Sequence, residues 1–179
     1  STLAAQAGAQ ELEPFYGCRR GFSCKREIQP ILDDNCITCH VRDGPEPAVN
    51  ASDKAFSLTG NDVKDGRSGR NWTTSYLRLT GAWKKDGKFA VQGKDDSPLV
   101  NWVSSQSRPS MLPPYHRGAA KSGLIKQLRE GHGKVKLSTE EMHKLCAWID
   151  LGVPFCGDYM EANCWNQKQK DFYLRYQQK

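Results

Sequence analysis

The chain has 179 residues, of which 37% are hydrophobic, and its 26 basic and 20 acidic residues leave a formal net charge of +6. This length suits one domain, while the mean hydropathy of −0.70 indicates that the side chains alone supply a thin apolar core. No run approaches the roughly 18 consecutive apolar residues of a membrane span, and no basic flank marks the start as a signal peptide. The positive charge is spread along the chain and not gathered on one face with aromatic platforms, which argues against nucleic-acid binding.

The N-terminal part is predicted to be a linker followed by a helix. Residues 1–14 form the linker, and residues 15–179 form a single domain. Within 25–34, three apolar residues follow the spacing of a helix face. They are Ile28, Ile31 and Leu32. Pro30 suits the first turn of this helix, where its missing N–H leaves no helical bond unmade.

The middle of the chain, about 50–104, is predicted to be an insertion of loops and short elements. Weak alternation of apolar and polar residues predicts short strands or a hairpin over 73–80 and 88–92. A short apolar stretch predicts a helix at 98–104. The segment 107–118 is rich in proline and therefore predicts an extended or turning loop.

Two helices are predicted in the C-terminal part. One spans 122–130 and ends at Gly131. The other begins after Ser138, where Glu141 three residues later completes a capping box. Aromatic residues among glutamines and lysines after Cys164 predict a surface helix packed back on the domain. The expected fold class is therefore mainly α, with a helical core and a loop and short-strand insertion.

Seven cysteines are an unusual number for a chain of this length. They are Cys18, Cys24, Cys36, Cys39, Cys146, Cys156 and Cys164. Cys18 and Cys24 enclose a short loop and are predicted to form a disulfide. Cys156 and Cys164 also enclose a short loop and are predicted to form a second disulfide. Apart from Cys36 and Cys39, which belong to the motif described next, this leaves Cys146 alone. Because disulfides persist in oxidising compartments, the chain is expected to be periplasmic or extracellular.

The motif Cys36-Ile37-Thr38-Cys39-His40 matches Cys-x-x-Cys-His, the attachment signature of c-type haem. On a helical turn, two thiols three positions apart lie along one porphyrin edge and add to its vinyl groups, and the next histidine reaches the iron. In a chain with seven cysteines and four histidines, about 0.006 accidental matches are expected. The sequence therefore predicts one covalent haem c bound through Cys36 and Cys39, with His40 as an axial ligand.

Two other uses of closely spaced cysteines fit less well. A zinc site needs a second ligand pair at matching spacing, and Cys156 and Cys164 are eight positions apart. A thioredoxin-like dithiol expects a βαβ setting, whereas a helix is predicted before this motif. Haem attachment is therefore the preferred interpretation.

The sixth iron ligand is predicted to be Met111, because a methionine from a downstream loop is a frequent axial ligand in small cytochromes. Its loop is stiffened by prolines. His116 in the same loop is the alternative ligand, Cys146 is a minor one, and an open sixth position is a further alternative. His132, between two glycines, and His143, on the polar side of a helix, are expected to be solvated.

Two aromatic residues are predicted to contact the haem. Tyr115 precedes His116 in the proline-rich loop, and Trp148 belongs to the last helix of the core. For Trp148, packing in the protein core is an equally good interpretation.

The segment 26–32, Arg-Glu-Ile-Gln-Pro-Ile-Leu, together with the haem motif resembles the opening of many bacterial monohaem cytochrome domains. The stretches 111–118, 131–138 and 148–159 resemble the C-terminal haem domain of the hydrazine synthase alpha-subunit family. This resemblance implies a cytochrome-c-like helical core with a long insertion. It also implies a module of a larger secreted bacterial protein, with similar domains attached to polysaccharide-degrading or carbohydrate-binding proteins.

The resemblance does not imply hydrazine synthesis. That activity belongs to a multi-haem assembly, and this chain has one haem motif. In that family a tyrosine four residues after the motif histidine can bind iron, and Gly44 occupies this position here. The departure favours an ordinary electron-transfer haem.

Two functions compete at this point. The first is electron transfer to a redox partner protein by a six-coordinate haem. The alternative is a haem enzyme or small-molecule-binding module with an open distal position, near which His116 or Tyr115 would supply a polar group.

Overall fold

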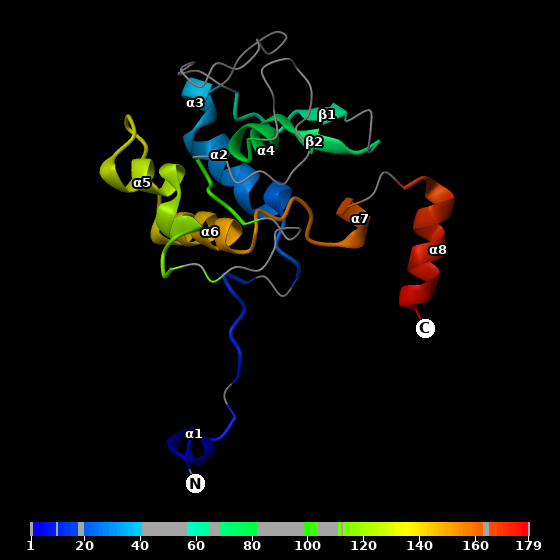
Figure 1. Cartoon of the computed structure of the whole chain (residues 1–179). Coiled ribbons are helices and arrows are strands. Elements are labelled where there is room, and N and C mark those ends of the chain that lie inside the picture. The colour runs from blue at the N-terminus through cyan, green and yellow to red at the C-terminus, as the bar shows by residue number, and fades with distance from the viewer. Residues whose placement is uncertain are drawn as a thin grey trace.

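The computed structural model describes residues 2–9, 11–17, 20–40, 57–64, 69–81, 99–103, 111, 113–162 and 165–178. In these ranges the chain is mainly helical and contains one two-stranded antiparallel sheet (Figure 1). The predicted mainly α class is therefore confirmed. None of the helices in the described ranges is long and apolar enough to cross a lipid bilayer.

A nearly continuous helical segment leads into the Cys-x-x-Cys-His motif. It consists of the π-helical η1 (Cys24–Ile28), α2 (Gln29–Asn35) and α3 (Ile37–His40). Ser23 caps its start, because the Ser23 hydroxyl accepts a hydrogen bond from the Arg26 N–H at 3.3 Å. Pro30 occupies the first turn of α2, where no helical bond requires its N–H. The helix predicted over 25–34 is confirmed.

A short hairpin and a buried helix are the regular elements of the described part of the insertion. They are β1 (Asp62–Lys64), β2 (Asn71–Thr73) and α4 (Thr74–Leu79), with Val63 paired to Trp72 across the hairpin. Thr73 caps α4 by accepting the Tyr76 N–H at 3.3 Å. The strand predicted over 73–80 is therefore wrong after Thr73. Every residue of α4 is buried, polar ones included, so the helix has no solvent-exposed face by which its period could be recognised.

Two further elements were predicted in the insertion, a strand and a helix. The strand predicted over 88–92 lies outside the described residues. The helix predicted over 98–104 is wrong for the described residues 99–103, which form a turn followed by irregular backbone. Asn101 has a φ of 49°, which lies in the left-handed region and interrupts a right-handed helix.

Both helices predicted in the C-terminal part are confirmed. They are α5 (Gly123–Glu130) and α6 (Thr139–Asp150), preceded by the short 3₁₀ helix η2 (Ala119–Lys121). Ser122 caps α5 by accepting the Ile125 N–H at 3.2 Å. The predicted capping box of α6 is also present, because the Ser138 hydroxyl accepts the Glu141 N–H and the Glu141 carboxylate accepts the Ser138 N–H.

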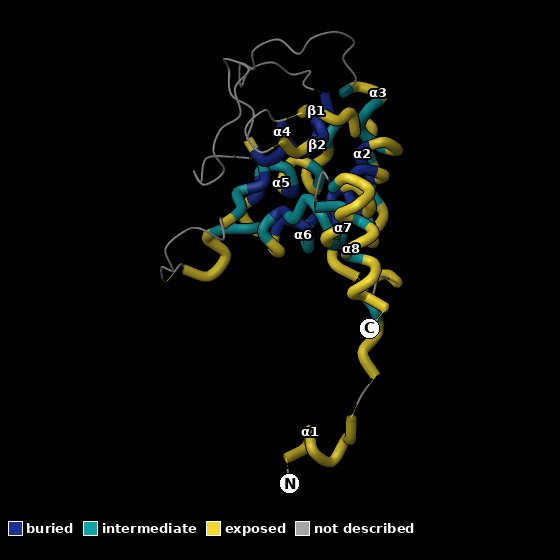
Figure 2. The backbone as a smooth tube through the Cα atoms, turned by 90° about the vertical axis from the view of Figure 1, so that its right-hand side faces the viewer, coloured by how far each residue is buried: buried dark blue, intermediate teal, exposed yellow. Residues whose placement is uncertain are grey.

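The core lies where η1, α2, α4, α5 and α6 meet, and buried residues gather there in Figure 2. Its largest fully buried side chain is Trp148 of α6, whose indole N–H donates to the Pro154 carbonyl at 3.1 Å. Tyr76 of α4 donates its hydroxyl to the Val153 carbonyl at 3.0 Å. Both polar groups thus have a partner, and these hydrogen bonds offset the cost of removing the groups from water.

Two glycines allow the segment before η1 to pass against the segment after α6. A Cβ placed on Gly21 would lie 1.9 Å from the Gly157 carbonyl oxygen, so no side chain fits there. Close to this crossing, the Cys24 N–H donates to the Phe155 carbonyl at 3.2 Å. The two glycines therefore hold the start of the helical segment against the end of the core.

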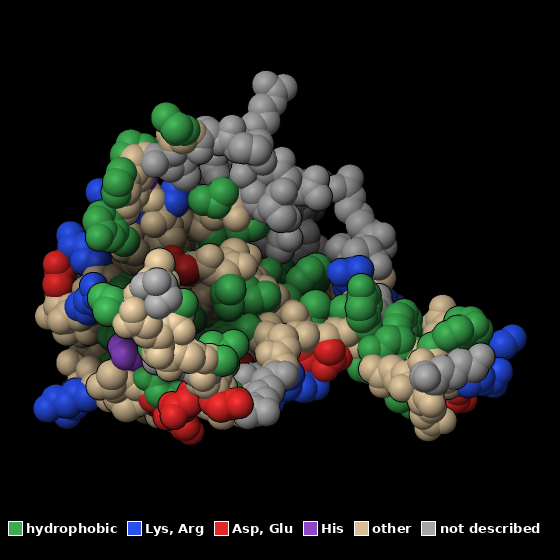
Figure 3. Space-filling view, turned by 90° about the horizontal axis from the view of Figure 1, so that it is seen from below, with side chains coloured by type: hydrophobic (Ala, Val, Ile, Leu, Met, Phe, Trp, Pro, Cys, Tyr) green, Lys and Arg blue, Asp and Glu red, His purple; other side chains and the backbone are tan. Residues whose placement is uncertain are grey.

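The two ends of the chain extend from this body. The one-turn helix α1 (Leu3–Gln6) is exposed, and the residues 2–13 that the structure describes contain no buried side chain. After α7 (Tyr159–Ala162), α8 (Gln167–Gln177) buries none of its residues. Figures 1 and 3 show α8 standing beside the body, with hydrophobic side chains on its surface. The predicted surface helix is confirmed, whereas its predicted packing back on the domain is not, because α8 buries none of its residues.

Glu141→Gln is expected to reduce the acid sensitivity of the fold. Hydrogen bonds from the backbone and side chain of Ser138 hold the pKa of Glu141 below its ordinary value. Ionised Glu141 therefore stabilises the fold above the unfolded pKa of about 4.3, and this contribution is lost as the pH falls through the lower folded pKa. Glutamine keeps the capping bond but does not titrate. Urea unfolding near neutral pH and in acid should show a smaller loss in the variant, and equal losses would contradict the assignment.

Candidate haem site

The Cys-x-x-Cys-His motif lies on one helical turn. The Cys36 N–H donates to the Leu32 carbonyl at 2.8 Å, and the His40 N–H donates to the Cys36 carbonyl at 3.0 Å. The helical geometry carries through the motif, so residues three and four positions apart lie on the same face. Cys36 and His40 are half-buried and Cys39 is exposed. The arrangement presents two thiols and an imidazole to one side of α3.

Both motif thiols are free, which is the state that reacts with a vinyl group to form a thioether. Burial, and then the negative charge of Glu141, raises the pKa of the Cys36 thiol. The thiol is therefore held protonated at neutral pH. The backbone of His40 is fixed as well, because its carbonyl accepts the N–H of the buried Leu58 at 2.9 Å.

The imidazole of His132 lies beside that of His40. The two ring centres are 6.0 Å apart and the ring planes are inclined by 23°. His132 comes from the turn after α5, where the Val135 N–H donates to the His132 carbonyl at 3.1 Å. Gly131 and Gly133 on either side have φ values of 102° and 58°, which glycine adopts without strain. These glycines allow the chain to reverse and present His132 to α3.

The Nδ1 atom of His132 has a defined partner. The Gln127 side-chain amide lies 3.0 Å from the His132 Nδ1. A histidine that binds a metal through Nε2 commonly donates its Nδ1 hydrogen to an oxygen acceptor, and a half-turn of the Gln127 amide places its oxygen there. Gln127 can therefore hold the ring through Nδ1 and leave Nε2 available for a metal.

The distance between the two imidazoles fits a haem iron. With imidazole–metal bonds of about 2 Å, two histidines on opposite sides of one metal have ring centres roughly 6 Å apart. The described residues contain no cluster of three or more His, Cys, Asp or Glu side chains that could hold a metal ion by themselves. Haem iron does not need such a cluster, since the porphyrin supplies four nitrogens and the protein only the axial ligands. The free thiols and the paired imidazoles together suit haem c.

The structure does not bring Met111 to His40. Met111 is 100% exposed, Tyr115 is 79% exposed and His116 is exposed. Their loop leads into Ala119, whose N–H donates to Asp150 at the C-terminal end of α6.

The haem motif lies near the N-terminal end of α6, whereas the loop of Met111 leads to its C-terminal end. The Asn35 amide, just before the motif, donates to Glu141 in the first turn of α6 at 2.9 Å. Because a helix rises about 1.5 Å per residue, these two ends of α6 lie about 13 Å apart. Ligation by Met111 or His116 stays a prediction that the geometry does not favour.

The other sequence candidates lie apart from the imidazole pair. Trp148 is completely buried by protein atoms, so no surface remains on it for haem contact. His143 is exposed, as predicted, and its Nδ1 lies 2.7 Å from the Tyr16 hydroxyl. Cys146 is half-buried, and burial raises the pKa of its thiol.

The structure shows neither of the predicted disulfides. Cys24 and Cys156 are both free thiols, and burial raises the pKa of the Cys24 thiol to about 12. Their predicted partners, Cys18 and Cys164, lie outside the described residues.

Sequence reasoning missed His132. It was predicted to be solvated, and in the structure its ring is half-buried and lies against His40. The glycines on both sides were the available signal, since they permit the reversal that presents the ring.

Compared with protein-family models, with curated proteins and with solved structures, the chain matches none of them.

Proposed function

We propose that this chain is a c-type cytochrome domain that transfers single electrons, with one haem attached through Cys36 and Cys39. His40 and His132 are its axial ligands. The observation that carries the proposal is the pair of imidazoles 6.0 Å apart, one of which belongs to a Cys-x-x-Cys-His motif with free thiols. The haem supplies one-electron chemistry at its iron, and the protein positions and shields it.

The protein's own residues favour an electron carrier over an enzyme. His40 and His132 would together hold the iron, and no ligand position would then remain for a substrate. Both rings come from anchored backbone, His40 from α3 and His132 from a turn held by its bridge to Val135. Ligands held in this way change little between oxidation states, which keeps the reorganisation during electron transfer small.

The biological setting follows from the same chemistry. Covalent haem attachment and the high cysteine content support a periplasmic or extracellular bacterial location. The electron donor or acceptor is a redox partner protein, and the domain serves as one module of a larger secreted protein.

Replacing both Cys36 and Cys39 with alanine is expected to abolish covalent haem attachment. The wild-type chain, produced in cells that attach haem c, should keep the haem after denaturation, and mass spectrometry should locate it on the peptide that contains both cysteines. Cys146→Ala is the matched control, because this thiol lies outside the motif, and it should retain the haem. A wild-type chain that carries no covalent haem would contradict the proposal.

A further inference from the structure

The helix α8 carries exposed aromatic rings side by side. Phe172 is 59% exposed and Tyr176 is 60% exposed, and their ring centres lie 4.9 Å apart. A hollow along this helix is lined by Trp165 and by residues of α8, and no residue of another described element contributes to its lining. Because contiguous apolar groups that stay exposed commonly mark an interaction site, the outer surface of α8 is a candidate binding surface.

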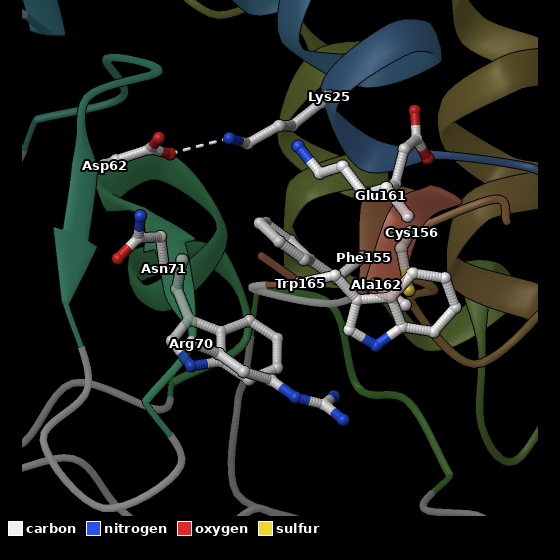
Figure 4. Close-up of a pocket in the computed structure, with 11 residues that line it drawn as sticks. Lys25, Asp62, Arg70, Asn71, Phe155, Cys156, Glu161, Ala162 and Trp165 are labelled. Carbon is white, nitrogen blue, oxygen red and sulfur yellow. Dashed lines mark hydrogen bonds and ion pairs between the residues drawn. The ribbon is translucent and has the colours of Figure 1, made fainter. Parts of the chain in front are cut away.

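The other side of α8 is turned toward the body of the protein. Lys170 of the helix and Trp165 before it line a cavity beside the β1–β2 hairpin, and Figure 4 shows Trp165 at this cavity. Residues two positions apart in a helix are separated by about 200° around its axis, so Phe172 lies on the side away from Lys170. The exposed rings are therefore turned away from the body.

Two cations lie on the same face as these rings. The spacing i, i+4, i+7, i+8, which gathers side chains on one side of a helix, relates Lys168, Phe172, Arg175 and Tyr176. Lys168 and Arg175 are exposed and pair with no carboxylate of the described residues. The single carboxylate of α8, Asp171, accepts a hydrogen bond from the Gln167 amide at 2.8 Å. With three cations and one carboxylate in the helix, this surface combines aromatic rings with a positive charge.

The charge of this surface restricts its occupant. A second copy of α8 would bring the cations of both helices together, with one carboxylate from each to offset them, and contacts between like charges weaken association. An anionic lipid surface supplies negative charge along the whole helix, whose 11 residues span about 16 Å. It also suits the rings of Trp165, Tyr173 and Tyr176, because each combines an apolar body with a polar group, as residues at the boundary of a bilayer do.

We propose that α8 binds the surface of an anionic lipid bilayer with its axis parallel to the membrane. Phe172 and Tyr176 enter the boundary between headgroups and acyl chains, and Lys168 and Arg175 reach the lipid phosphates. None of the helices in the described residues is long and apolar enough to cross a bilayer, so α8 anchors the domain to one side of it. The inference is independent of haem binding.

Co-sedimentation of the full-length chain with lipid vesicles tests this proposal. One set of vesicles contains equal parts of phosphatidylcholine and phosphatidylglycerol, and the other contains phosphatidylcholine alone. The chain is expected to bind the anionic vesicles about tenfold more tightly, because each cation near an anionic surface contributes to the affinity. This binding should weaken as salt is added, since salt screens the attraction.

Two apolar residues of α8 provide a matched pair of variants. Phe172→Ser is expected to weaken binding to the anionic vesicles about tenfold, because the ring no longer leaves water on binding. Leu174 is 43% exposed but lies about 200° around the helix from Phe172. Leu174→Ser should therefore leave the affinity unchanged. Both variants should keep the wild-type circular dichroism spectrum.

A second pair of variants tests the charges at constant net charge. Lys168→Gln combined with Arg175→Gln is expected to weaken vesicle binding about tenfold. Lys134→Gln combined with Lys136→Gln removes two exposed cations from the turn after α5, which lies across the body from α8 in Figure 1, and should leave the affinity unchanged.

Three results would overturn the proposal. They are equal binding to the two kinds of vesicle, equal effects within either pair of variants, and absence of vesicle binding. In the last case, titration with hexaglutamate identifies the alternative occupant. If the chain binds this peptide and the α8 charge variant binds it less tightly, the surface fits an acidic protein and not a lipid bilayer.

Discussion

In His132→Ala, the ferric protein is expected to lose a low-spin absorption spectrum and to acquire a high-spin one. His132 lies with its ring centre 6.0 Å from that of His40, so if the two imidazoles hold the iron as proposed, its removal would leave that position to water or empty. Strong-field imidazole ligands on both sides hold haem iron low-spin, and one imidazole alone does not. Adding free imidazole to the variant should restore the low-spin spectrum, which distinguishes a lost ligand from a misfolded protein.

Met111→Ala and His116→Ala are the matched controls for this experiment. Both side chains are exposed, and their loop leads to the other end of α6 from the haem motif. Each control should keep the wild-type spectrum. If Met111→Ala instead loses the weak red sulfur-to-iron band of a methionine-ligated haem while His132→Ala leaves the spectrum intact, the paired-histidine arrangement is wrong.

Trp148→Ala is expected to lower the free energy of unfolding by about 3–5 kcal/mol, the range for a large aromatic residue removed from a core. The side chain is fully buried between α6 and the rest of the core, and its ring centre is 6.3 Å from that of Tyr76. Alanine leaves a cavity and also leaves the Pro154 carbonyl without the indole N–H that it accepts. Urea unfolding followed by far-ultraviolet circular dichroism measures this loss.

Leu151→Ala is the control for that loss. Leu151 follows directly after α6 and is 62% exposed, so its truncation removes little buried surface. Surface substitutions of this kind change stability by about 0.5 kcal/mol or less. A Trp148→Ala variant that loses no more than Leu151→Ala would show that Trp148 does not support the core.

Features encoded within a few neighbouring residues are predictable from the amino-acid sequence. The haem motif is contiguous, and its spacing alone implies two thiols and an imidazole on one helical turn. The start of α6 depends on Ser138 and Glu141, three residues apart, and both halves of their capping box are present. The same holds for the Ser122 cap of α5. In each case the interacting groups are brought together by local backbone geometry, which leaves the rest of the chain little influence.

Features that depend on long-range packing could not be predicted in this way. The residues of α4 are all buried, so neighbouring elements, and not a polar and an apolar face, determine that they form a helix. His40 and His132 are 92 positions apart, and only the tertiary arrangement that places the turn after α5 beside α3 brings their rings together. The sequence alone thus determined the Cys-x-x-Cys-His motif, from which haem attachment and an axial histidine are predicted. The tertiary structure decided which distant side chain faces that ligand, because a contact between remote residues depends on the packing of every element between them.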